Sequence, residues 1–393
     1  MSLGFQQQRI IHLFISNFRE GANPLRLIVF MIRNKIFITA FVVFLFLPIF
    51  GNVFNVSVVG DLFEKRIAAT KPEFPVNLSE LEAYPKKFNK YYNDNYGFRK
   101  DLISINGSMM DKVFNESPDD RVLVGKDGWL YFDNRNSLLD AAGRAKINKE
   151  LIDKGVEVFY KNWQIAKKKN IKYLFVIAAD KTTIYSQFLP DYFKYGKNHR
   201  IDVFKNALLR KYPDFPLVDL RDILLKAKDK EIIYHKTDTH WNKRGAHYGY
   251  VEIMRKLNLK PYLREDFNEV ENGEYFGDIA QIMGVKQTNR DFGLTKKFVN
   301  NIYLNGKKSN ELEQIFHKAE VFEHNNKALP KLFVYKDSFF GELQNLVSEH
   351  FSVSLYLNEF PCRIDYDILE NYSPDYIIQQ FWENRIESVL KKC

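Results

Sequence analysis

The longest apolar stretch of this chain lies near its N-terminus. No residue between Lys35 and Asp61 carries a charge, and the dense part, residues 36–50, reads IFITAFVVFLFLPIF. About 20 helical residues cross a bilayer, and a core helix rarely runs this long without a charge. We therefore expect a transmembrane helix at residues 36–58. Pro48 is compatible with it, because neighbours in membrane helices re-satisfy the freed backbone groups.

Further along the chain, short apolar runs alternate with segments whose apolar residues recur every three or four positions. The runs predict buried strands and the spacing predicts amphipathic helices. A hairpin is expected over residues 122–132, with its turn at residues 125–128. The expected strands are 173–178, 217–220, 332–335, 353–356 and 376–378; the expected helices carry Ile152, Val156, Phe159, Trp163 and Ala166, then Ala246, Tyr250, Ile253 and Leu257, then Leu343, Leu346, Val347 and Phe351. This alternation predicts an α/β domain with a mostly parallel sheet covered on both faces.

The pattern divides the chain into four parts. We expect a cytoplasmic tail at residues 1–35, the membrane anchor at 36–58, a juxtamembrane linker with a helical region at 59–119, and the main domain at 120–393. Within that domain, residues 264–329 show neither the helical nor the strand pattern of apolar residues, so loops, turns and short irregular pieces are expected there.

Charge orients the membrane segment. The whole chain carries Lys+Arg 58 against Asp+Glu 49, a net +9. Residues 1–35 hold five basic residues and one acidic residue, and only +5 is spread over the rest. The positive-inside rule then leaves the N-terminus in the cytoplasm and everything after about residue 60 outside the cytoplasmic membrane. A cleaved signal peptide is less favoured, because a 35-residue basic leader precedes the apolar run and no clear small-residue cleavage motif follows it.

Composition excludes several classes of protein. A hydrophobic fraction of 45% and a charged fraction of 27% are typical of a globular chain. The dispersed basic excess gives no nucleic-acid footprint. Two cysteines, Cys362 and Cys393, exclude a disulfide framework and a four-cysteine zinc site, and leave one bridge open. No dinucleotide, P-loop or zinc motif occurs, so we expect no cofactor and no metal.

Ser338 follows one of the expected strands, in the segment VYKDSFFGELQNLV at residues 334–347. In α/β folds, sites lie at the carboxyl ends of strands. A serine that opens a helix there has an exposed hydroxyl next to free amides, which suits a nucleophile with an oxyanion donor. The alternative is that Asp337 or Ser338 is only a helix N-cap.

Asp238 and His240 lie two residues apart in YHKTDTHWNKRG, residues 234–245. In an extended segment their side chains would project to the same side, and Asn242 suits the N-cap of the next helix. A carboxylate beside an imidazole makes a general base for a serine. Two alternatives stand: a structural Asp–His pair, or a metal site, whose possible ligands are His235, His240, His247 and Asp238. The metal spacing matches no compact zinc motif.

Several segments resemble the alginate O-acetyltransferase family of AlgJ and AlgX type, which is SGNH-hydrolase-like and circularly permuted. The specific part is TDTHWN at residues 237–242 with DSF at 337–339. Supporting segments are DGWLYF at 127–132, ADKTTIYSQFLPDY at 179–192, GDIAQIMG at 277–284 and PDYIIQQFWENR at 374–385. The order is acid, base, then serine, similar to the permuted arrangement of that family. The resemblance covers roughly residues 90 to 390.

The resemblance implies a three-layer SGNH-like domain with Ser338 as nucleophile, His240 as base and Asp238 as orienting carboxylate. It implies acetyl transfer to a hydroxyl of an exported polysaccharide, with a membrane-bound O-acyltransferase as the partner that supplies the acetyl group. Lys181 and Tyr185 are expected near the site, to hold substrate or to orient the loop, with an exposed lysine and a packed tyrosine as the alternative. Lys336 stands where SGNH motifs commonly have a glycine, and the Ser338 amide is the expected oxyanion donor.

Two other functions use the same residues. A membrane-tethered carbohydrate acetyl esterase would run the same triad with water as acceptor. A non-catalytic scaffold of a polysaccharide export complex would keep the fold without turnover.

Overall fold

The computed structural model describes residues 24–54, 68–134, 136–298, 302–304 and 319–393. These residues fall into two compact units, one with the described residues up to 105 and the other with those from 106 onward. Each unit is described by itself.

The first unit contains two long helices, α2 (Pro24–Phe54) and α3 (Leu78–Asn95). Within α2, residues 28–51 form a helix long and apolar enough to cross a membrane, and no residue of its apolar 18-residue window is buried inside the protein. Residues 55–58 of the expected span lie outside the described residues. Asn77 caps α3, because its side chain accepts from the Glu80 amide. The segment before α3 is tied to the helix end where the Ala69 amide donates to Asp94.

The second unit is built on a seven-stranded sheet with the strand order β4-β3-β11-β9-β10-β8-β7. The first five of these strands are parallel, and β8 runs antiparallel to β10. The strands are β3 (Lys172–Ala178), β4 (Leu217–Asp219), β7 (Ile302–Leu304), β8 (Ala319–His324), β9 (Lys331–Tyr335), β10 (Val353–Leu357) and β11 (Tyr376–Trp382). All five parallel strands expected from the sequence are confirmed, as is the mostly parallel α/β fold.

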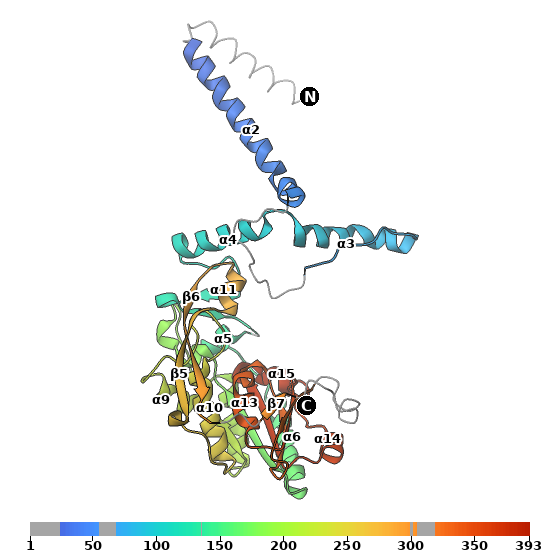
Figure 1. The fold of residues 1–393 in the computed structure, drawn as a ribbon, viewed down its shortest axis with the longest axis vertical. Helices are drawn as coiled ribbons and strands as arrows, with labels where there is room; N and C mark the ends of the chain where they lie inside the picture. Colours follow the sequence, from blue (N-terminus) through green and yellow to red (C-terminus); the bar gives the residue numbers. More distant parts are fainter. Residues whose placement is uncertain (1–23, 55–67, 135, 299–301, 305–318) are drawn as a thin grey trace. The chain divides into compact units, whose positions relative to one another are not determined.

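Helices cover both faces of this sheet (Figure 1). Because successive side chains of a strand point to opposite faces, each strand contributes to both hydrophobic cores. From β3, Leu174, Val176 and Ala178 pack with α9 (Arg221–Ala227), α10 (Lys243–Lys256) and α13 (Gly341–Ser348). Tyr173, Phe175 and Ile177 pack on the opposite side. Their partners there are α6 (Lys149–Lys168), α8 (Arg200–Lys211), α14 (Tyr366–Asn371) and α15 (Ile386–Leu390). The three predicted helices correspond to α6, α10 and α13.

Shorter elements complete the described chain. The expected hairpin is confirmed as β1 (Val122–Val124) paired antiparallel with β2 (Leu130–Phe132). The remaining helices are α4 (Arg99–Met109), a π-helix (Met110–Phe114), α5 (Ser137–Ala141), α7 (Lys181–Ile184), α11 (Asp278–Met283), and 3₁₀ turns at Lys126–Gly128, Ser186–Phe188, Arg264–Asp266, Ser338–Phe340 and Glu383–Arg385.

The expectation of irregular structure over residues 264–329 is wrong for much of that segment. Strands β5 (Phe267–Phe276) and β6 (Thr288–Lys296) form a long antiparallel ribbon, α11 lies between them, and β7 and β8 follow. Most of β5 is exposed, so its sequence FNEVENGEYF lacks the alternation that marks a half-buried strand. Part of the segment, residues 305–318, lies outside the described residues.

The two cysteines form the bridge that the sequence left open, between Cys362 and Cys393. Cys362 is fully buried in the core on the α6 side of the sheet.

Candidate active site

Ser338 lies at the carboxyl end of β9, where the strand gives way to a 3₁₀ turn and then α13. The N-cap is Asp337, whose Oδ1 accepts from the Phe339 amide at 3.1 Å. Asp337 is 1% exposed and also accepts from the amide of Trp382 and the side chains of Gln380 and Arg385. Asp337 therefore fixes the turn, and the exposed hydroxyl of Ser338 is left for another partner.

That partner is His240. Its Nε2 lies 2.8 Å from the Oγ of Ser338, and its Nδ1 lies 2.7 Å from Oδ1 of Asp238. The three side chains thus form one hydrogen-bonded row, although 98 residues separate the imidazole from the serine. With Asp238 on Nδ1, the tautomer that presents an unprotonated Nε2 to the serine is the favoured one.

The loop between α9 and α10 holds the acid and the base. The expectation of an extended segment is wrong, because residues 236–240 form consecutive bends closed by an antiparallel bridge between Tyr234 and Trp241. The side chains still meet, since Oδ1 of Asp238 also accepts from the His240 amide in a local turn. Asn242 caps α10 as expected.

The pKa values of Asp238 and His240 are shifted in opposite directions. Burial raises the pKa of Asp238, but the hydrogen bond and charge of His240, with the amides of His240 and Asp278, outweigh burial and hold that pKa far below its ordinary value. Burial works against the His240 cation, yet the hydrogen bond and charge of Asp238, aided by Asp278 and Asp337, raise the pKa of His240 above 6.5. The carboxylate therefore stays ionised and stabilises the imidazolium.

Residues from the ribbon of β5 and β6 and from α11 donate hydrogen bonds to Asp238. Its Oδ2 accepts from the Tyr275 hydroxyl and from the Asp278 amide, both at 2.9 Å. Gly277 allows this approach, because a Cβ there would lie 2.1 Å from the carbonyl oxygen of Thr237. Sequence reasoning assigned no role to these residues, although GDIAQIMG was among the segments that carried the resemblance.

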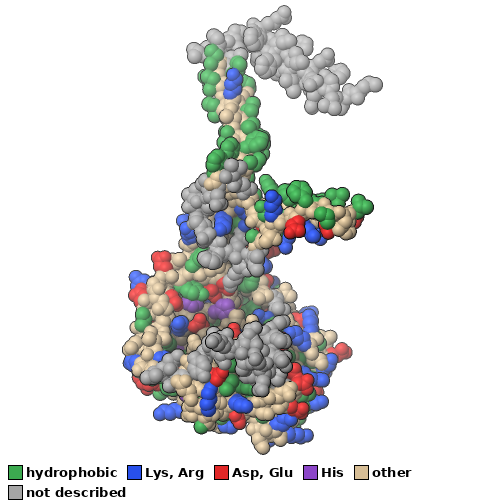
Figure 2. Space-filling view, turned by 45° about the vertical axis from the view of Figure 1, so that its right-hand side comes forward, with side chains coloured by type: hydrophobic (Ala, Val, Ile, Leu, Met, Phe, Trp, Pro, Cys, Tyr) green, Lys and Arg blue, Asp and Glu red, His purple; other side chains and the backbone are tan. Residues whose placement is uncertain are grey.

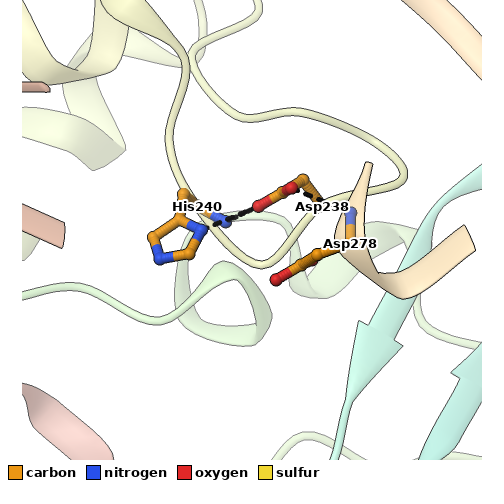
Figure 3. Close-up of side chains that lie close together, drawn as sticks. All are labelled: Asp238, His240 and Asp278. Atoms are coloured by element: carbon orange, nitrogen blue, oxygen red, sulfur yellow. Dashed lines mark hydrogen bonds and ion pairs between the residues drawn. The ribbon is translucent and has the colours of Figure 1, made fainter. Parts of the chain in front are cut away.

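Asp238, His240 and Asp278 also lie close enough to be weighed as a metal site (Figure 3), with donor atoms within 4.8 Å of one another. However, both oxygens of Asp238 and the Nδ1 of His240 are engaged within the protein, and Asp278 Oδ1 accepts from the Thr239 amide. These contacts fit a hydrogen-bonded network better than a ligand set.

The metal set considered from sequence is not assembled. His247 Nε2 lies 3.1 Å from the carbonyl oxygen of Tyr262. His235 stacks on Tyr275 at a centroid distance of 3.9 Å and lies beside Asp291.

Lys181 and Tyr185 follow β3 and are both buried, so the alternative of an exposed lysine is wrong. The Nζ of Lys181 donates to the main-chain carbonyls of His235, Lys236 and Asp238 at 3.3, 3.0 and 2.6 Å. Burial lowers the pKa of Lys181 to about 8, against the charges of Asp238, Asp278 and Asp180. Its contacts are those of a group that orients the loop.

Tyr185 is packed. Its ring stacks on Trp129 at 4.1 Å between centroids, and its hydroxyl accepts from the Ile233 amide. Neither Lys181 nor Tyr185 lines the pocket described next.

A pocket of 390 Å³ opens over Ser338 and His240. Its apolar lining comes from Trp241 and Phe339. Its polar lining comes from Lys243, Asn272, Tyr275, His235, Asp291 and Glu342. The amide of Ser338 donates no hydrogen bond to any described residue, since the N-cap takes the Phe339 amide instead. That amide lies beside the hydroxyl, where an oxyanion would develop.

The fold and this Ser–His–Asp arrangement define a protein of the SGNH-hydrolase-like class. Residues 122–323 match the family described as "SGNH hydrolase-like domain, acetyltransferase AlgX", and the chain belongs to that family. Asp238 and His240 lie inside the match, and Ser338 lies beyond its end.

Relatives of known name agree with this membership. The chain is 24% identical over 207 residues to "Probable alginate O-acetylase AlgJ" of Pseudomonas syringae pv. tomato. This alignment covers 51% of this chain and 50% of that protein. The chain thus spans about half the length of the curated relative it matches. Bacillus cereus PatB1 has a similar structure, with a TM-score of 0.50, 17% identity and coverage of 68% of this chain and 97% of that one. PatB1 with a sulfonyl adduct gives a TM-score of 0.51 at 17% identity, with coverage of 67% and 97%. At such identity these structures support the fold alone.

Proposed function

We propose that this protein is a membrane-anchored O-acetyltransferase that acetylates hydroxyl groups of an exported polysaccharide through an acetyl-serine intermediate. The observation that carries the proposal is the row from Ser338 Oγ through His240 to Asp238, at 2.8 and 2.7 Å, in a chain of an acetyltransferase family. The substrate class follows the name of the AlgJ relative, a probable alginate O-acetylase.

In the first half-reaction His240 Nε2 takes the proton of Ser338 as Oγ attacks the acetyl carbonyl. The amide of Ser338 stabilises the oxyanion, and the imidazolium, held by Asp238, returns the proton to the departing donor group. In the second half-reaction His240 deprotonates a sugar hydroxyl, which attacks the acetyl-serine. The acetyl group passes to the sugar oxygen, and the serine regains its proton.

Polar side chains make up most of the pocket lining and supply partners for the hydroxyls of a sugar, and the largely buried rings of Trp241 and Phe339 contribute its apolar part. Water must be kept from the acetyl-serine for transfer to prevail over hydrolysis. The sugar would therefore bind over Trp241 and Phe339 and cover the intermediate.

The site is proposed to work outside the cytoplasmic membrane, with α2 as its anchor. The apolar window of α2 is long enough to span, and the basic residues before residue 36 favour a cytoplasmic N-terminus. The Cys362–Cys393 bridge supports this side, because disulfides persist in oxidising compartments. A membrane-bound O-acyltransferase partner would deliver the acetyl group at the bilayer, where an anchored enzyme can meet it.

Mass spectrometry of the intact chain tests the proposal. The detergent-solubilised protein is incubated with a small activated acetyl ester, with or without neutral and uronate oligosaccharides. We expect one added acetyl group on the wild type, none on Ser338→Ala, and transfer to an oligosaccharide when one is present. Ser373→Ala, which removes an exposed serine, is the matched control and should acylate normally.

Two other results of this experiment would each support one of the alternative functions. Acylation followed only by hydrolysis, with loss of acetyl groups from acetylated oligosaccharides, indicates an esterase. A wild type that neither acylates nor hydrolyses contradicts the triad and favours a scaffold. A sulfonyl fluoride gives an independent readout: it should label the wild type and not Ser338→Ala.

A further inference from the structure

Helix α3 presents an uncovered apolar face. No residue of this helix is buried, and Leu81, Phe88 and Tyr92 are 55%, 42% and 45% exposed. The apolar positions recur at three- and four-residue spacings, which places them on one side of the helix. They are Leu78, Leu81, Tyr84, Pro85, Phe88, Tyr91 and Tyr92. An uncovered apolar stripe of this length indicates a surface that contacts something else.

The stripe is unusually aromatic. Rings of Phe74, Tyr84, Phe88 and Tyr91 follow one another with centroids 5.8, 6.0 and 6.2 Å apart. Phe74, just before the helix, is 79% exposed. Three of the seven residues in the stripe are tyrosines, whose rings are apolar and whose hydroxyls are polar. Such side chains are enriched at the membrane–water interface.

The opposite side of α3 is charged but electrically balanced. It carries three acidic residues and three lysines, which are Glu80, Glu82, Asp94, Lys86, Lys87 and Lys90. In Figure 2 hydrophobic side chains gather along one side of this helix and charged side chains along the other. The balance means that electrostatic attraction to a charged partner would contribute little.

We propose that α3 is an interfacial helix that lies in the headgroup region of the phospholipid bilayer, with its aromatic stripe inserted and its charged side in water. The place of α3 in the chain favours a bilayer over a protein partner, because only residues 55–77 separate it from the apolar helix α2. A helix with one apolar side and one strongly charged side lies in the interface plane, because spanning the membrane would bury its charges in hydrocarbon. The inference goes beyond the enzymatic proposal: it rests on the membrane helix α2 of that proposal and not on the chemistry of the site.

Two positions on opposite sides of α3 allow a matched test. Leu81 lies in the centre of the stripe, whereas Lys90, nine residues along, is on the far side of the helix at 100° per residue. Both native cysteines are in the disulfide, so a thiol-reactive fluorophore labels only an introduced cysteine. Leu81→Cys and Lys90→Cys are labelled in the full chain, which is reconstituted into phosphatidylcholine vesicles with lipids that carry a spin label near the headgroup.

The expected result is quenching at position 81 at least about threefold stronger than at position 90, with little change between low and high salt. Equal quenching at both positions, or none at position 81, would overturn the proposal. Quenching at position 81 that disappears at high salt would also overturn it. A further outcome would overturn the proposal. If the fluorophore at position 81 were shielded from water only at high protein density, and without quenching by the lipids, a second copy of the chain would be covering the stripe.

A third label separates this inference from the role of α2. Phe44→Cys, measured in vesicles whose lipids carry the spin label deep in the acyl chain, reports insertion of the apolar helix. Quenching at position 81 without quenching at position 44 supports the interfacial helix and contradicts the spanning anchor. Quenching at position 44 alone supports the anchor and overturns the interfacial helix.

Discussion

The ammonium of Lys181 donates a hydrogen bond of 2.6 Å to the main-chain carbonyl of Asp238, the residue whose side chain orients His240. Asp180 caps the short helix α7 that begins at Lys181, and Asn384, beyond β11, donates to Asp180 at 3.0 Å. The loop that holds the acid and the base is therefore fixed to the ends of two sheet strands through one buried lysine.

Replacing Lys181 should impair catalysis through geometry. Lys181→Met keeps a similar chain length but leaves three carbonyls without their donor, so the loop should shift. We expect kcat to fall roughly 10- to 100-fold while KM for a small acetyl ester stays constant, because a displacement of about 1 Å costs that much in rate. The control is Lys228→Met, which removes an ammonium that donates to the Ile184 carbonyl. Equal losses in both variants, or a change confined to KM, would contradict the positioning role.

The rate should depend on pH through His240. The neutral imidazole is the active base, and the pKa of His240 is raised above 6.5, so kcat/KM should rise with pH through a midpoint above that value. In Asp238→Asn the hydrogen bond to an anion and its charge are lost while burial remains. The midpoint should then move to lower pH, and the rate should fall by about 10³–10⁴. A midpoint that does not move would show that another group controls the profile.

Asp337 should matter for stability as well as for the position of Ser338. Asp337→Ala leaves four donors without their acceptor, among them the Trp382 amide and the Arg385 side chain. Because Asp337 and most of these donors are buried, we expect the free energy of unfolding to fall by about 3–5 kcal/mol in urea titrations. Ser338→Ala, one residue away and exposed, should change it by less than about 0.5 kcal/mol. Similar stabilities for the two variants would refute the anchoring role.

Gly277 offers a test of the contact between α11 and the loop. A Cβ at this position meets the Thr237 backbone, so Gly277→Ala should push the Asp278 amide away from Asp238. We expect kcat to fall roughly 10-fold or more, because the carboxylate loses part of its support. Gly273→Ala is a comparison for backbone strain alone: its φ is +86°, which disfavours alanine, but no atom lies within 4 Å of the added Cβ. If Gly277→Ala turned over ester like the wild type, the close approach would be irrelevant to the site.

The disulfide should affect stability and leave the chemistry alone. It joins residues 31 apart in the core on the α6 side of the sheet, whereas Trp241 and Phe339 of the pocket belong to the core on the other side. The double variant Cys362→Ser/Cys393→Ser should lose roughly 3–4 kcal/mol, the entropy expected for such a loop. Reductant should reproduce the loss in the wild type and have no effect on the variant. Loss of kcat in the folded variant would be the contrary outcome.

Much of the fold was predictable because buried strands and amphipathic helices leave strong periodic patterns. The strand at residues 173–178 alternates between two cores, and its apolar run predicted it within one residue. The ribbon of β5 and β6 could not be found in this way, because it has no continuously buried face. Its two strands pair through backbone hydrogen bonds, and most of their side chains are exposed.

The candidate triad was predictable for a different reason. An Asp–His spacing and a strand–serine–helix pattern are local, and the family resemblance linked them. Among the supporting residues, Lys181 was expected near the site and Asp337 was considered as an N-cap, but their contacts were not predictable, and Tyr275 was not found at all. These residues reach the site through partners far away in the sequence, or through main-chain groups that a sequence does not position.

The place of β11 in the sheet has a consequence for how this protein matures. β11 comes after every other strand of the sheet in the chain, yet it lies between β3 and β9 and pairs with both. The strand that delivers Ser338 can join the strand that leads to Lys181 only once residues 376–382 have been synthesised and have inserted between them. A nascent chain would carry its acid, base and serine for some time as separate pieces. The candidate site would therefore be complete only when the last strand of the sheet is in place.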